Sequence, residues 1–201
     1  MARKFFEIKT DLDKVAGSIP DDPTKNMTEG EKYLYEWATE TIRIWRAELQ
    51  TKDKNSTGNL SSSFDPLPIE KKTAGFALKI EAAYYWKFID LGVKGARSGT
   101  KAPNSPFKFT SKYPPLEAIT KWLNFRPDVR TKLATIFGVD DSPESRKFVA
   151  KKMQKSIFMR GIKATPFVNA AINRERINEM QDYMAQFFEK ELSELIIVEK
   201  K

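Results

Sequence analysis

The segment MTEGEKYLYEWATETIRIWRAELQT, residues 27–51, carries the clearest structural signal in this sequence. Its apolar residues recur at spacings of three and four, which places them on one face of a helix. They are Leu34, Trp37, Ala38, Ile42, Trp45 and Leu49. Thr28 is a candidate N-cap, and Glu29 and Glu31 suit the positive end of the helix dipole. The pattern predicts a long amphipathic first helix over residues 27–51.

Beyond this helix and a turn cluster at 55–59, the periodicity becomes alternating. Phe76, Leu78 and Ile80 alternate with small or charged residues, as in a half-buried antiparallel strand. Four segments have strand-like composition: 60–64, 67–72, 76–82 and 84–91. Residues 84–89 leave a short helix open as an alternative. We therefore predict a small antiparallel sheet after the first helix.

Helical signals return from Pro114 onward. Pro114-Pro115 opens a predicted helix whose apolar face holds Leu116, Ile119, Trp122 and Leu123. A short helical piece near 129–137 is expected to end at Gly138. Ser142-Pro143 is an N-cap followed by a first helical residue, and that helix would bury Val149, Met153 and Ile157.

Thr165-Pro166 repeats the same start signal for a long last helix. Its expected apolar stripe is Ile177, Met180, Met184, Phe187 or Phe188, Leu192 and Leu195. With helices flanking a small sheet, the fold class is α+β. We expect an extended arm at 1–26 and a single α+β domain at 27–201, with a long loop at 93–113 and a helical insertion at 114–160.

The composition excludes several classes of function. The 201 residues contain no Cys and no His, which removes thiol nucleophiles, Ser-His-Asp arrangements and Cys/His zinc sites. No apolar run approaches the ~20 residues of a membrane span, and the charges of Glu7, Lys9 and Asp11 interrupt any signal-peptide core. We therefore expect a protein made in a cytosol, with no membrane contact.

Positive charge is concentrated in two places within a net charge of +8. Residues 93–113 hold five cations and no acid, and residues 144–163 hold seven cations against one acid. Such patches meet nucleic acid or an acidic protein surface, and a solvated helix face with a solvated loop is the alternative.

The loop at 93–113 is rich in Gly, Ser and Pro, so we expect its own contacts not to offset an ordering cost of ~1–2 kcal/mol per residue. Phe107 and Phe109 would then be anchors for a neighbouring subunit; the alternative is that they fold back on their own domain. We expect the loop to be mobile in the free subunit and ordered on assembly. The candidate interface residues are Lys94, Arg97, Lys101, Phe107, Lys108 and Phe109.

Three stretches occur in an order that resembles the tail-completion, neck and head–tail joining proteins of tailed bacteriophages. They are TGNLSSSF at 57–64, AYYWKFIDLG at 83–92 and RGIKATPFVNAA at 160–171. Pro114-Pro115 with Ile119 and Trp122 is similar to a helix inserted in longer members. The sequence departs from the family pattern at Asp90, where glutamate is usual. The residues that match the family motifs, expected to act as fold determinants, are Thr57, Gly58, Leu60, Tyr84, Asp90, Gly92, Gly161, Pro166 and Phe167.

The resemblance implies a structural virion protein, made in the cytoplasm of the bacterial host, that forms a sixfold or twelvefold ring joining the head and portal to the tail. Its implied partners are copies of itself, portal or neck proteins and tail-tube proteins, with possible contact to packaged DNA. The apolar stripes of the first and last helices, with the exposed part of the first helix and the loop after Gly92, are candidate contact surfaces.

Two alternatives to this function differ in class. The basic segments suit a DNA-binding protein without enzymatic activity. A metal-dependent nuclease can be traced formally through Pro20-Asp21 and Glu70-Lys71-Lys72, although such short patterns arise often by chance. We nominate no catalytic, metal or cofactor-binding residue and expect no enzymatic activity.

Overall fold

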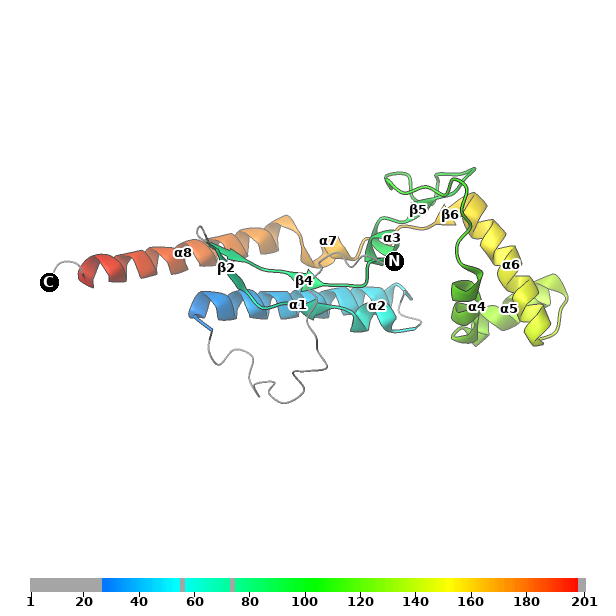
Figure 1. The fold of residues 1–201 in the computed structure, drawn as a ribbon, viewed down its shortest axis with the longest axis horizontal. Helices are drawn as coiled ribbons and strands as arrows, with labels where there is room; N and C mark the ends of the chain where they lie inside the picture. Colours follow the sequence, from blue (N-terminus) through cyan, green and yellow to red (C-terminus); the bar gives the residue numbers. More distant parts are fainter. Residues whose placement is uncertain (1–26, 55–56, 73–74, 199–201) are drawn as a thin grey trace. The chain divides into compact units, whose positions relative to one another are not determined.

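The computed structural model describes residues 27–54, 57–72 and 75–198. Long helices and short antiparallel strand pairs make up these ranges, so the fold class is α+β, as predicted (Figure 1). The helices are α1 (Glu29–Thr51), α2 (Asn59–Ser62), α3 (Trp86–Asp90), α4 (Leu116–Asn124), α5 (Pro127–Phe137), α6 (Pro143–Arg160), α7 (Val168–Ala171) and α8 (Arg174–Val198). The strands are β1 (Asp65–Pro66), β2 (Glu70–Lys72), β3 (Gly75–Ala77), β4 (Ile80–Glu81), β5 (Val93–Lys94) and β6 (Gly161–Ile162).

The chain divides into two compact units. Of the described residues, unit 1 comprises 27–48, 62–72, 75–84 and 168–198, and unit 2 comprises 49–54, 57–61 and 85–167. A single domain over 27–201 stays a prediction, and the predicted arm at 1–26 lies outside the described residues.

Helix α1 confirms the prediction made from its apolar stripe. The side chain of Thr28 accepts a hydrogen bond from the N–H of Glu31, and the Glu31 carboxylate accepts one from the N–H of Thr28. This reciprocal capping satisfies two N–H groups at the helix start. The predicted stripe is buried except for Trp37, which is half-buried. Because the stripe is buried by other parts of the same chain, the expectation that it forms a contact surface was wrong.

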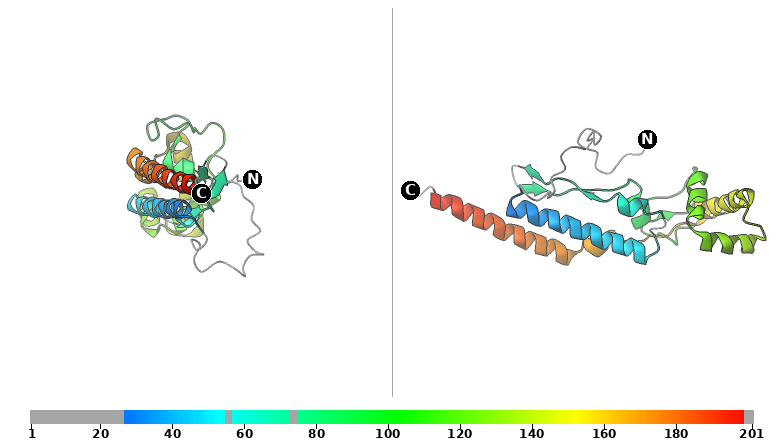
Figure 2. Two further views of the ribbon diagram at one scale, coloured as in Figure 1. Left: turned by 90° about the vertical axis from the view of Figure 1, so that its left-hand side faces the viewer. Right: turned by 90° about the horizontal axis from the view of Figure 1, so that it is seen from below.

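Helices α1 and α8 lie side by side and antiparallel in unit 1 (Figures 1 and 2). The ring of Tyr33 stacks on that of Tyr183 with 3.8 Å between centroids, and the Arg176 guanidinium lies over Trp37. At Gly30 a Cβ would lie 2.8 Å from the Phe187 ring. The missing side chain therefore allows the two helices to approach closely. The predicted apolar face of α8 is half-buried through Ile177, Met180, Met184 and Phe187, and the side chains of Leu192 and Leu195 lie outside the described ones.

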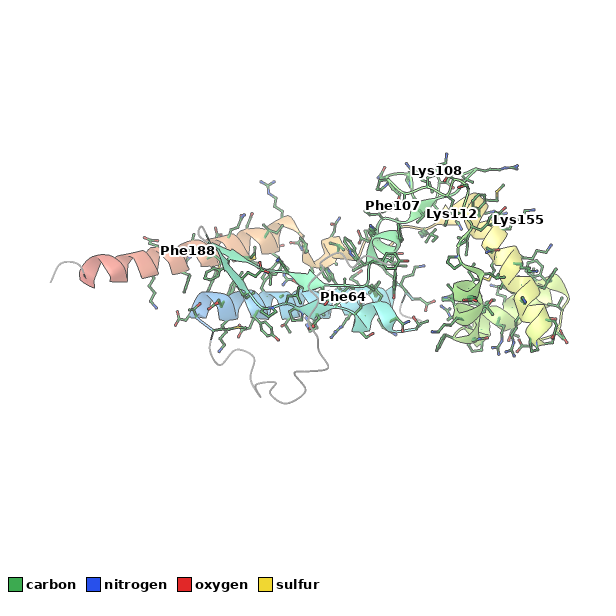
Figure 3. The ribbon with its side chains drawn as sticks, viewed as in Figure 1. Phe64, Phe107, Lys108, Lys112, Lys155 and Phe188 are labelled. Atoms are coloured by element: carbon green, nitrogen blue, oxygen red, sulfur yellow. The ribbon has the colours of Figure 1, made fainter. Side chains whose placement is uncertain are left out.

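The predicted sheet is divided into three antiparallel pairs, β1–β4, β2–β3 and β5–β6. Residues 60–64 are not a strand, because α2 occupies 59–62 directly after the turn at Gly58. The alternative of a short helix within 84–89 is confirmed by α3. In unit 1 the β2–β3 hairpin places the Phe76 ring against Phe187 and Phe188, and Phe64 packs against Trp45 (Figure 3).

Helices α4, α5 and α6 form a small helical core in unit 2, as predicted. Buried Ile119 and Leu123 of α4 pack with Val149 and Ala150 of α6. Met153 and Ile157 extend this contact and are partly buried. Helix α5 ends at Gly138 in the left-handed region (φ 62°), and the Ser142 side chain caps α6 by accepting from the N–H of Ser145.

The predicted start of the last helix was wrong. Thr165-Pro166 precedes only the four-residue α7, and two non-helical residues separate α7 from α8. The second start has its own cap, because the side chain of Asn173 accepts a hydrogen bond from the N–H of Arg176. The Thr-Pro signal thus marks the beginning of a short turn of helix instead.

Candidate functional site

The second and third resembling stretches meet at a buried carboxylate. Oδ1 of Asp90 accepts a hydrogen bond from the backbone N–H of Phe167 at 2.8 Å. The N–H of Thr165 donates to the carbonyl of Ile89 at 2.9 Å. Asp90 is 7% exposed and Phe167 is fully buried, so this junction is internal to unit 2.

Two glycines of the same stretches allow the backbones to pass at close range. Gly92 has φ 70°, and a Cβ there would lie 2.6 Å from the N of Ala164. Gly161 has φ 82°, and a Cβ there would lie 2.2 Å from the carbonyl oxygen of Val93. Any side chain would collide with backbone that cannot move aside, which explains glycine at both positions.

The first stretch contributes a turn and a link to the second. Gly58 has φ 69° with open space around it, Leu60 is buried and Thr57 is exposed. In unit 1, Oγ of Ser63 accepts a hydrogen bond from the N–H of Ala83 at 2.9 Å. Tyr84 is 42% exposed, so it is not a core residue. Pro166 is exposed, and its carbonyl accepts from the Lys52 ammonium.

The loop at 93–113 has more internal contacts than its composition suggested. The N–H of Lys94 donates to the carbonyl of Phe107 at 2.8 Å, and the N–H of Phe109 donates to the carbonyl of Lys94 at 2.9 Å. Oγ of buried Ser105 donates to the carbonyl of Gly92 at 2.7 Å, and Ala102 is buried beside it. The expectation that the loop has almost nothing to bury was therefore wrong, and its mobility stays a prediction without that support.

Both loop phenylalanines contact aromatic residues of their own unit. Phe107 meets Phe88 edge to face at 4.8 Å between centroids, and Phe109 lies 6.0 Å from Phe158. This matches the alternative in which the rings fold back on their own domain. Contact of their outer parts with a neighbour stays a prediction. Of the cations named with them, Arg97, Lys101 and Lys108 are exposed and Lys94 is half-buried.

Unit 2 is strongly basic. It holds 19 Lys and Arg residues against seven acids, a net charge of +12, whereas the whole chain carries +8. Five of the seven acids are engaged in ion pairs or hydrogen bonds within unit 2: Asp53, Asp90, Asp128, Asp140 and Asp141. Eleven of the 19 cations lie in the loop at 93–113 and in α6.

The acids around α5 and α6 are held in their charged form. The Arg126 guanidinium donates two hydrogen bonds to Asp128, at 3.0 and 2.9 Å, and lowers the pKa of that carboxyl to about 2. A hydrogen bond from Arg146 lowers the pKa of Asp141. General acids need the opposite shift, so these carboxylates act as counter-ions for arginine.

An exposed aromatic ring of unit 2 lies where two lysine-bearing segments meet. Tyr113 is 51% exposed and stacks on Phe158 of α6 with 4.1 Å between ring centroids. Nε2 of Gln154 donates to the carbonyl of Pro114 at 2.7 Å, which holds this segment along α6. Figure 3 shows Lys112 beside the part of α6 that carries Lys155. We define the basic surface as Lys108, Lys112, Tyr113, Lys151 and Lys155, whose four lysines are exposed.

The cations of the basic surface are visible in the sequence, but the sequence analysis predicted neither their grouping nor the part of Tyr113. Two signals could have found the group. Lys108-Phe109 and Lys112-Tyr113 repeat a lysine–aromatic pair, and Lys147, Lys151 and Lys155 recur every four residues on α6. A spacing of four places these side chains on one face of the helix.

Unit 2 also exposes apolar side chains where α5 ends and α6 begins. Ile136 is 64% exposed, Phe137 39% and Phe148 43%, and the two phenylalanine rings meet edge to face at 6.1 Å. We call these three residues the apolar patch. Sequence reasoning missed it, because the periodicity of α5 predicted a helix without showing which residues a neighbouring helix covers.

The carboxylates of the nuclease alternative are not assembled into a described site. Asp21 lies outside the described residues, and Glu70 forms an ion pair with Lys79. Among the residues that the structure describes, no group of three or more acids could hold a metal ion. A shallow groove of about 430 Å³ lies in unit 1 along α1 and β1, and the exposed ion pair between Glu40 and Arg43 is at its edge.

Comparison with protein-family models, curated proteins and solved structures finds no match for the chain. In the described ranges, every helix is too short or too polar to cross a membrane. The resemblance to phage neck proteins therefore depends on the three stretches and enters below as a proposal.

Proposed function

We propose that this chain is a structural virion protein of a tailed phage, which forms a ring in the neck or at the head-proximal end of the tail. The observation that supports this most is the contact between Asp90 and Phe167, since it joins two of the resembling stretches across 77 residues. The stretches thus act together as fold determinants.

Ring closure requires a head-to-tail contact, in which two different patches of each subunit meet. The apolar patch suits one side of such a contact. Isolated apolar residues are ordinary on a protein surface, but two exposed phenylalanine rings in contact, with exposed Ile136 next to one of them in the chain, form a candidate interface. The exposed cations of the loop, Arg97, Lys101 and Lys108, are candidates for a separate contact, since the loop bonds to the C-terminal end of α6 and the apolar patch lies at its beginning.

The mechanism we propose is docking without covalent chemistry. Each subunit contacts two copies of itself, and the ring contacts the portal or another neck protein on one side and the tail tube on the other. The partners bind the ring through surfaces only.

The copy number in purified particles tests this function. Quantitative mass spectrometry against the portal protein as internal standard should find six or twelve copies of the chain per particle. Several hundred copies, as in a shell, would contradict a ring, and so would absence from washed particles.

A further inference from the structure

The basic surface lacks internal neutralisation. Among the described residues, none of Lys108, Lys112, Lys151 and Lys155 takes part in an ion pair. Three acids of unit 2, Asp53, Asp128 and Asp141, are paired with arginines instead. Four exposed ammonium groups without counter-charges attract a polyanion.

The two segments that carry these lysines meet at one ring, that of Tyr113. Lys108 and Lys112 lie on the segment that Tyr113 and Pro114 attach to α6. Lys151 and Lys155 lie on α6 four residues apart, and Phe158 follows Lys155 by three, so all three side chains share a face of that helix. The lysines therefore belong to the two segments that the stacked pair Tyr113–Phe158 joins.

The exposure and support of the Tyr113 ring indicate which class of polyanion the basic surface binds. Its ring lies nearly parallel to the Phe158 ring, with an interplanar angle of 19°, and Phe158 is 9% exposed. One face of Tyr113 is thus supported by a buried side chain while about half of its surface stays accessible. A flat, supported aromatic ring among lysines provides a stacking platform for a base, and an acidic peptide would have no use for it.

We propose that the basic surface binds nucleic acid, with its four lysines on backbone phosphates and Tyr113 stacked on a base. Because the bases of a duplex are already stacked and paired, single strands should bind more tightly than duplexes. This inference does not depend on the proposed ring, since it concerns one unit of one subunit.

The test uses the full chain and fluorescein-labelled DNA of about 20 nucleotides, as a mixed-sequence single strand and as a duplex. Fluorescence anisotropy is measured between about 50 and 200 mM salt, where four released counterions predict a logarithmic slope of about −3 for the single strand. Lys108→Gln/Lys112→Gln/Lys155→Gln should weaken binding about tenfold or more and reduce that slope by about 2. Tyr113→Ala should weaken single-strand binding about tenfold and leave duplex binding unchanged.

The matched control is Lys54→Gln/Lys121→Gln/Lys132→Gln, which removes the same charge from exposed positions elsewhere in unit 2. Its affinity for the single strand should fall less than about threefold. Equal losses in both triple variants would overturn the proposal, because binding would then follow net charge alone. Equal affinity for polyglutamate of matched charge would overturn it as well, and would point to an acidic protein surface.

Self-association is the remaining alternative. Helix α8 exposes Glu175, Glu179, Asp182 and Glu189 on one face, which a lysine surface of another copy could bind. Salt-sensitive oligomers that disappear in the Lys108/Lys112/Lys155 variant, in a chain that does not bind DNA, would replace nucleic acid by a second copy as the partner.

Discussion

The carboxylate of Asp90 accepts a hydrogen bond from the backbone N–H of Phe167, 77 residues further along the chain. Both residues are buried, so neither group has water available as a full substitute. A buried donor without an acceptor costs about 1–3 kcal/mol. This contact is therefore a point at which unit 2 should be sensitive to substitution.

Asp90→Ala should lower the free energy of unfolding by about 1–3 kcal/mol, because it leaves the Phe167 N–H without that acceptor. Asp90→Asn keeps an acceptor oxygen and should lose less. Urea denaturation followed by circular dichroism measures both. Glu117→Ala, at an exposed position, should stay within about 0.5 kcal/mol. If Asp90→Ala were as stable as that control, the junction would not hold unit 2 together.

A comparison of the stabilities of Gly92→Ala and Gly138→Ala distinguishes the cost of backbone strain from that of a steric collision. Both glycines have positive φ, which costs another residue about 1–2 kcal/mol. Only Gly92 faces a collision, since a Cβ there meets the N of Ala164 at 2.6 Å and nothing lies within 4 Å at Gly138. Gly92→Ala should therefore be less stable than Gly138→Ala by a further 1–3 kcal/mol, roughly the cost of overpacking. Equal losses would mean that the backbones near Gly92 are not held at this distance.

The paired hydrogen bonds from Arg126 predict a measurable shift at Asp128. Its pKa is about 2, against an ordinary value of 3.8. A folded-state pKa below the unfolded value stabilises the fold above the unfolded pKa, and this contribution is lost as pH falls from about 4 to about 2. In Arg126→Gln the pKa of Asp128, followed by carboxyl-carbon NMR, should return toward 3.8. Arg146→Gln removes a partner of Asp141 instead and should leave the Asp128 titration unchanged.

The apolar patch should contribute to contacts between copies. Phe148→Ser should weaken self-association by about tenfold or more, as expected for an aromatic residue at the centre of an interface. Because Phe148 is 43% exposed, the stability of the subunit should change little. Sedimentation velocity over a concentration series measures the association. Phe125→Ser, which removes another exposed aromatic residue of unit 2, is the control; an equal effect there would show that the patch has no special role.

The helices of the fold could be predicted from local signals, and the strands less well. α1 and α6 combine regularly spaced apolar residues with a side-chain cap, and α4 combines them with Pro114-Pro115 at its start. All of these are properties of neighbouring residues. The strand predicted at 60–64 was wrong, because a short helix follows the turn at Gly58 there. Residue preferences alone do not indicate this helix. The predicted start of α8 was wrong because Thr165-Pro166 carried the stronger cap signal. The residue that caps α8 is Asn173.

The positive charge of the candidate site could be predicted from the sequence, but the arrangement of its residues in space could not. The cations of 93–113 and 144–163 are visible in the sequence. The position of Tyr113 depends on Phe158, 45 residues away, and on the hydrogen bond between Gln154 and Pro114. The contacts of Phe107 and Phe109 with their own unit likewise depend on side chains distant in sequence. Periodicity shows which residues share a face of one element and not which distant element covers that face.

The central claim is that this chain forms a ring between head and tail. Cryo-electron microscopy of purified particles, with the neck reconstructed without imposed symmetry and compared with particles lacking this chain, tests it most directly. The account predicts a closed sixfold or twelvefold ring at the head–tail joint that accommodates both compact units and disappears when the chain is absent. Density for isolated copies elsewhere on the particle, or an unchanged neck without the chain, would contradict it.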